Sequence, residues 1–126
     1  MSSPMSVEVR TDFAMARGNH LVETAKFTLA ILFGTAVVLA FASEQVLAGP
    51  LSYALTALII SVCIFGILGL DGSIQDIKAG ISDMTPEEQE TNIGKVATAL
   101  PFGLYRILII VIYVAIGLTQ LIMIYS

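Results

Sequence analysis

The sequence predicts an all-α integral membrane protein with three transmembrane helices and short amphipathic cytoplasmic helices in the second loop. Hydrophobic residues make up 56% of the 126 residues and charged residues only 13%, about half the charged share of an ordinary soluble domain. The apolar residues fall in three long blocks, each near the ~20 residues that cross a bilayer as a helix. The alternating ~10-residue segments typical of a transmembrane barrel do not occur in the sequence.

The predicted spans are residues 27–43, 51–70 and 102–125. The first two contain no charged residue, and the third contains only Arg106, near its start. A helix suits each span because it satisfies its own backbone hydrogen bonds where water is absent. The short loop 44–50 ends in Gly49-Pro50 and predicts an antiparallel hairpin of the first two spans.

The distribution of Lys and Arg predicts the orientation. All six basic residues lie in residues 1–26 or between the second span and the early third span, and none lies in loop 44–50 or at the C-terminus. Basic residues concentrate on the cytoplasmic side of membranes. We therefore expect a cytoplasmic N-terminal arm (1–26), a cytoplasmic second loop (71–101) and a C-terminus on the far side. A bacterial inner membrane, or a viral membrane derived from it, fits best.

An alternative concerns the first span. Basic residues precede it, and Ala40-Phe41-Ala42 resembles a signal-peptidase site. Cleavage there would leave a two-span mature chain, as in secreted pilin subunits. The three-span chain remains the main expectation.

Within the N-terminal arm, Met5, Val9 and Phe13 recur every four residues, a weak amphipathic pattern. Gly18-Asn19 then predicts a break, after which Asn19 could cap the helix of the first span. We expect a short surface helix or an ordered arm, with a disordered arm as the alternative.

The second loop predicts two helices. Ser73 with Asp76 forms a weak capping pair for the first. Thr85-Pro86 with Glu88 is a stronger start signal for the second, which should run towards Leu100. Pro101 then predicts a kink or break before the third span.

The first of these helices presents an apolar stripe of residues spaced three or four apart: Ile74, Ile77, Ile81 and Met84. The loop holds six acidic residues and two lysines between positions 71 and 100. Anionic lipid attracts basic helices and would repel this acidic one. The stripe is therefore predicted to pack on protein, either closing its own bundle or docking a partner.

Residues for chemistry are few. No Cys or His pattern predicts a metal site, and the lone His20 and lone Cys63 are interpreted as surface and packing residues. The spans hold no His for haem and no mid-span carboxylate for proton transport. The acidic balance disfavours nucleic-acid binding. We expect no catalytic residues, no metal and no cofactor.

The spans do contain a helix-packing pattern. Ala30 with Gly34, and Ala57 with Ser61, are pairs of small residues four apart, a spacing that lets helices approach closely in lipid. In the third span, Arg106, Tyr113 and Gln120 are each seven apart, and Gly117 shares their face. We expect this polar face to contact helices of this chain or of a neighbour. For Arg106 alone, reaching to the cytoplasmic interface is the favoured interpretation, with helix contact as the alternative.

These observations predict a non-enzymatic accessory or structural subunit of a larger membrane assembly. Its partners would be the lipid bilayer and other membrane subunits or copies of itself. The alternatives are a homo-oligomeric pore or holin-like lysis protein, and a viral-membrane or pilin-type filament component.

Overall fold

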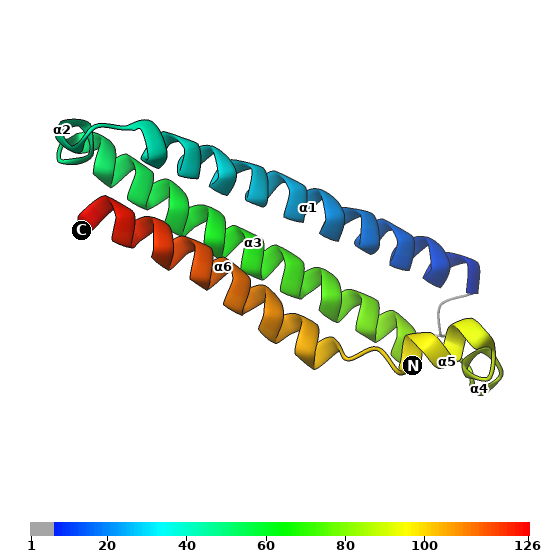
Figure 1. Ribbon diagram of the computed structural model, residues 1–126. Helices are drawn as coiled ribbons and strands as arrows, with labels where there is room; N and C mark the ends of the chain where they lie inside the picture. Colours follow the sequence, from blue (N-terminus) through cyan, green and yellow to red (C-terminus); the bar gives the residue numbers. More distant parts are fainter. Residues whose placement is uncertain (1–6) are drawn as a thin grey trace.

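The computed structural model describes residues 7–126, which form helices and no strand (Figure 1). The helices are α1 (Val7–Phe41), α2 (Glu44–Leu47), α3 (Pro50–Ser82), α4 (Pro86–Gln89), α5 (Asn92–Thr98) and α6 (Phe102–Tyr125). Three of them, α1, α3 and α6, are long and apolar enough to cross a membrane. The predicted all-helical fold with three candidate spans is therefore confirmed for the described residues.

The three long helices lie side by side (Figure 1). Helix α3 runs antiparallel to both α1 and α6, so α1 and α6 are parallel to each other. Helix α3 packs along much of both neighbours, whereas α1 and α6 meet over a shorter stretch. Helix α2 and the C-terminus lie at one end of the bundle, and α4 and α5 lie at the other (Figure 1).

The buried positions of α1 and α3 recur at steps of three and four residues. On α1 they include Thr24, Thr28, Leu32, Thr35 and Leu39, and on α3 they include Ser52, Leu55, Ile59, Val62, Gly66, Leu70 and Ser73. The steps average 3.75 residues on α1 and 3.5 on α3, close enough to the 3.6-residue helical turn to keep one face of each helix toward its neighbour. The two helices can therefore stay in contact well beyond the length of a membrane span.

Helix α1 continues through the position where the sequence predicts a break. It runs without interruption from Val7 to Phe41, so the predicted break at Gly18-Asn19 is wrong. One glycine inside a helix costs only about 1 kcal/mol, and contacts with α3 on either side offset that cost. On the N-terminal side of Gly18, Arg17 pairs with Asp76 of α3. On its C-terminal side, Thr24 packs beside Gly69 of α3. Of the apolar residues predicted in the arm, Met5 lies outside the described residues.

Helix α3 also continues past its predicted end. The sequence predicts a new helix capped by Ser73, but α3 runs from Pro50 to Ser82 and Ser73 lies buried inside it. The predicted cap is therefore wrong. Ser73 and Ile74 extend the buried seam of α3, so burial favours continuing the helix rather than ending it at Asp71-Gly72.

The start of the next helix is confirmed, but its length is not. Thr85 caps α4 by accepting a hydrogen bond from the Glu88 amide, and Pro86 takes the first helical position. The predicted single helix to Leu100 is wrong, because α4 ends at Gln89 and Thr91 caps a separate α5. The connection is so tight that a Cβ on Gly94 would lie 2.8 Å from the Gln89 Cα. The predicted break at Pro101 is confirmed, since α6 begins at Phe102.

Helices α1 and α3 are longer than a bilayer requires. At 1.5 Å per residue they extend about 50 Å, against a hydrocarbon core of about 30 Å. The excess lies at the α4–α5 end, where both helices carry their charged residues. We call this part the stem: residues 7–26 of α1, residues 71–82 of α3, and α4 with α5.

Tyrosines mark both ends of the apolar region. Tyr53 lies in the first turn of α3 and Tyr125 at the end of α6, both exposed at the α2 end of the bundle. Tyr105 is exposed in the first turn of α6, at the other end. Tyrosine is enriched at membrane–water interfaces, so this placement agrees with three membrane spans.

Candidate functional site

A row of polar side chains joins α1 to α6 inside the apolar region. The hydroxyl groups of Thr28 and Tyr113 are hydrogen bonded to each other. Seven residues further along both helices, the Thr35 hydroxyl donates to Gln120 Oε1 at 2.5 Å. Gln120 Nε2 donates in turn to the Leu32 carbonyl at 2.8 Å. We call these four side chains, Thr28, Thr35, Tyr113 and Gln120, the polar seam.

The polar seam is closed to its surroundings. Thr28 is 0% exposed, Tyr113 2% and Gln120 5%. The Thr28 hydroxyl also donates to the Thr24 carbonyl at 2.8 Å, so its bond with Tyr113 uses the Tyr113 hydrogen. Buried polar groups in lipid need such partners, and here the partners come from the same chain. The seam can therefore fix the register and rotation of α6 against α1.

Glycines let α6 approach α3 closely. A Cβ on Gly66 would lie 2.8 Å from Cζ of the Tyr113 ring, and one on Gly117 would lie 2.9 Å from Cys63 Sγ. Both distances are shorter than ordinary van der Waals contact. The Cys63 thiol also donates to the Tyr113 carbonyl at 3.5 Å. Close packing on α3 thus holds the Tyr113 ring in the position from which its hydroxyl reaches α1.

Arg106 lies seven residues before Tyr113, at the exposed start of the same face of α6. It is exposed, and its guanidinium pairs with Asp71 of α3 at the end of the apolar region. Nη2 lies 3.3 Å from Asp71 Oδ2 as a second contact. Exposed pairs of this kind contribute less than about 1 kcal/mol. Arg106 therefore ties the start of α6 to α3 without joining the polar seam.

Apart from Arg106, the predicted interface residues divide into two groups. Tyr113, Gly117 and Gln120 share the buried face of α6 and contact helices of their own chain. The four small residues of the first two spans are all exposed on the outside of the bundle: Ala30, Gly34, Ala57 and Ser61. A Cβ on Gly34 would meet nothing within 4 Å. Their contact with another chain stays a prediction.

Sequence reasoning missed the α1 half of the polar seam. Thr28 and Thr35 are seven residues apart, the same separation as Tyr113 and Gln120. Both bonds join residues 85 positions apart, as parallel helices in register require. Matching seven-residue spacings of polar residues on two spans were therefore the available signal.

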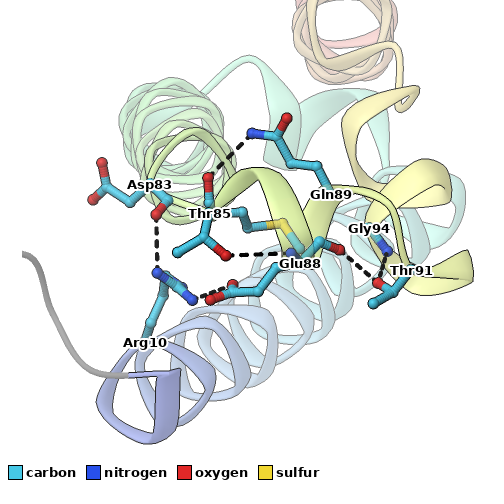
Figure 2. Close-up of polar contacts among 8 residues, drawn as sticks. Arg10, Asp83, Thr85, Glu88, Gln89, Thr91 and Gly94 are labelled. Atoms are coloured by element: carbon cyan, nitrogen blue, oxygen red, sulfur yellow. Dashed lines mark hydrogen bonds and ion pairs between the residues drawn. The ribbon is translucent and has the colours of Figure 1, made fainter.

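The stem has its own polar cluster, centred on Arg10 of α1 (Figure 2). The Arg10 guanidinium pairs with Glu88 of α4, and Nη1 donates to the Asp83 carbonyl at 2.9 Å. These contacts fasten α4 and the end of α3 to the start of α1. Only 8% of the Arg10 side chain is exposed, against 23% for Glu88, so this pair is much less solvated than an ordinary surface pair.

The predicted docking stripe lies along the stem. Ile74 is buried, whereas Ile77, Ile81 and Met84 are half-buried. Ile81 and Met84 line a groove of about 350 Å³ between α1, α3 and α5. The stripe thus both contributes to the bundle and borders an open surface.

The polar seam should respond to the loss of a single amide. Replacing Gln120 with leucine removes the bonds to Thr35 and Leu32, and each interhelical bond in lipid contributes about 0.6–2 kcal/mol. We expect lower resistance to unfolding in a detergent titration, with normal membrane insertion. Thr119 is the control, because it is exposed and its hydroxyl bonds only the Ala115 carbonyl of its own helix. Equal stability of Gln120→Leu and Thr119→Val would contradict the role of the seam.

The last two observations concern possible metal sites and similarity to known proteins. Within residues 7–126, no group of three or more His, Cys, Asp and Glu side chains is placed to hold a metal ion. His20 is exposed in the stem, and Cys63 is half-buried between α3 and α6. No family model, curated protein or solved structure matches the chain.

Proposed function

We propose that the chain is a non-catalytic accessory or structural subunit of a larger membrane assembly. The observation that carries this proposal is the polar seam, whose side chains bond to one another inside the bundle. Polar groups committed to holding helices together are not free for catalysis or transport.

The charge of the spans supports the same proposal. Residues 27–43 and 51–70 contain no Asp, Glu, His, Lys or Arg, and Arg106 of the third span pairs with Asp71 at its edge. Proton- or ion-coupled transport generally uses ionisable groups in the middle of the membrane. A structural role requires none.

The outward faces of α1 and α3 favour contact with other helices. Ala30 and Gly34 lie one turn apart on α1, and Ala57 and Ser61 lie one turn apart on α3, all exposed. Small residues let a neighbouring helix approach closely in lipid, where hydrophobic burial no longer drives association. We propose that other membrane subunits, or further copies, contact these faces.

Purification of the tagged chain from its native membrane in mild detergent tests the proposal. We expect it to migrate with other membrane subunits at a mass well above 13.4 kDa. Gly34→Leu should reduce that complex because the added side chain fills the outward face. Val38→Leu is the matched control, since Val38 is exposed on the same helix and is already large. A chain that stays monomeric without co-purifying subunits would refute the proposal.

Expression in a bacterial host separates this function from the alternative of a pore. Accumulation of the protein without dye entry or growth arrest agrees with a structural subunit. Entry of a membrane-impermeant dye, or abrupt growth arrest, would instead indicate a homo-oligomeric pore.

For orientation, we propose that the stem faces the cytoplasm. The stem holds five of the six basic residues, and Arg106 lies at its border. Loop 44–50 at the other end has none. The positive-inside bias therefore supports a cytoplasmic stem. The orientation can be measured by placing a cysteine at Ser82 or Ser126 and labelling it from outside intact cells.

A further inference from the structure

The groove on the stem is lined mainly by apolar side chains from three helices. We call it the stem groove; its lining includes Ala14 and Met15 of α1, Ile81 of α3 with the adjoining Met84, and Ile93 of α5. Met15 is 64% exposed and Ile93 80% exposed. Arg10, which is buried, and Glu88, which is half-buried, form the charged part of its lining. Methionine side chains adapt to varied partners, so this surface suits an apolar helix face.

The stem groove lies outside the lipid. Gly80, which lines it, is about 15 Å along α3 from Leu70, the last residue of the apolar span. Arg10 is about 25 Å along α1 from Phe27, where the first span begins. The interfacial layer adds only about 5–8 Å to each side of the hydrocarbon core. Exposed Met15 and Ile93 are therefore not explained by contact with the bilayer.

The acidic residues near the groove indicate the charge of a partner that could bind there. Four acids and no base lie between positions 83 and 90: Asp83, Glu87, Glu88 and Glu90. Among residues 7–126, Glu88 alone of these four forms an ion pair, with Arg10. Lys95 of α5 offsets only one of the other three carboxylates, so the described part of this end of the stem keeps a net negative charge. Anionic lipid and the equally acidic stem of a second copy would both be repelled.

We propose that the stem groove binds a basic amphipathic helix of a partner protein. Its apolar face would cover Met15, Ile81 and Ile93, and its Lys or Arg residues would meet the carboxylates of the α4 segment. Helix-in-groove recognition of this kind uses anchors spaced at three and four residues. The inference rests on the proposed function, because it names the chemistry of one partner of the same subunit.

Disulfide trapping with a defined probe tests this proposal in the full chain. The background is Cys63→Ala, and the chain is held in nanodiscs of zwitterionic lipid. The probe is a Leu/Lys amphipathic helix with one cysteine on its apolar face. Ile93→Cys reports on the groove, and Val96→Cys is the matched control because it is exposed on the same short helix but does not line the groove. A Leu/Glu helix with the same apolar face is the control probe.

After correction for thiol reactivity, we expect Ile93→Cys to trap the basic probe about tenfold faster than Val96→Cys does. We also expect Ile93→Cys to trap the acidic probe about tenfold more slowly than the basic probe. Replacing Glu87 and Glu90 with glutamine should remove most of the preference for the basic probe. Equal trapping at positions 93 and 96, or of the two probes, would overturn the proposal. Preferential trapping of a second copy of the chain through Ile93→Cys would overturn it in favour of self-association. Co-purification of subunits is measured separately, so failure here leaves the proposed function independently testable.

Discussion

Replacing Gly66 with alanine should destabilise the protein by about 1–3 kcal/mol, the usual cost of overpacking a filled core. An added Cβ would lie 2.8 Å from Cζ of the Tyr113 ring, so the ring must move. Tyr113 cannot move freely because its hydroxyl bonds Thr28 on the opposite side. The substitution therefore weakens two contacts together: the packing of α3 on α6 and the bond from α6 to α1. Thermal unfolding in mild detergent measures the loss.

Gly34→Ala is the matched control for this substitution. Both glycines lie inside apolar helical segments, so both variants gain the same helix propensity, up to about 1 kcal/mol. A Cβ on Gly34 meets nothing within 4 Å, so that variant should be neutral or more stable. Opposite signs for one chemical change would show that the Tyr113 contact, and not the backbone, decides the outcome.

A double variant tests the cause directly. Changing Tyr113 to leucine removes the ring that the new methyl group would strike, at the expense of the bond to Thr28. Gly66→Ala should then cost less in the Tyr113→Leu background than in the natural chain, a coupling expected between residues in contact. Additive effects would contradict the packing argument.

The sequence could predict the three spans and the buried face of the third. Apolar length determines the spans, and the seven-residue repeat of Tyr113 and Gln120 places both on one side of a helix whatever it packs against. The small-residue pairs were less informative. Ala30 and Gly34 share a helix face, but a pattern within one helix does not tell which neighbour that face meets.

The helix ends were harder to predict because they depend on tertiary contact. Gly18-Asn19 and Ser73 look like helix boundaries when each helix is considered alone, yet α1 and α3 continue through them. The paired seams of the two helices contribute burial that one glycine does not outweigh. The cluster around Arg10 was equally hidden, since its partner Glu88 is 78 positions away. Only the register of two long antiparallel helices brings the two side chains together.

Replacing Arg10 with glutamine should open the α4–α5 end of the stem while leaving the spans intact. The change leaves the Glu88 carboxylate and the Asp83 carbonyl without their cationic partner. An orphaned, largely buried polar group costs about 1–3 kcal/mol, and more if it is charged. Glu88 keeps some access to water, so the lower part of the range for charged groups applies. Hydrogen exchange in residues 86–98 should accelerate by about tenfold or more, the factor that 1.4 kcal/mol of local stability gives.

Arg17→Gln is the control, because Arg17 pairs with Asp76 at 3.2 Å in the same stem but both side chains are about two-fifths exposed. An exposed pair contributes less than about 1 kcal/mol, so exchange in residues 86–98 should change little. Adding Glu88→Gln to Arg10→Gln should restore part of the protection, since two neutral amides replace an uncompensated charge. Equal exchange in the Arg10 and Arg17 variants would mean that α4 and α5 are held by their packing against α3, and that the buried ion pair adds nothing to it.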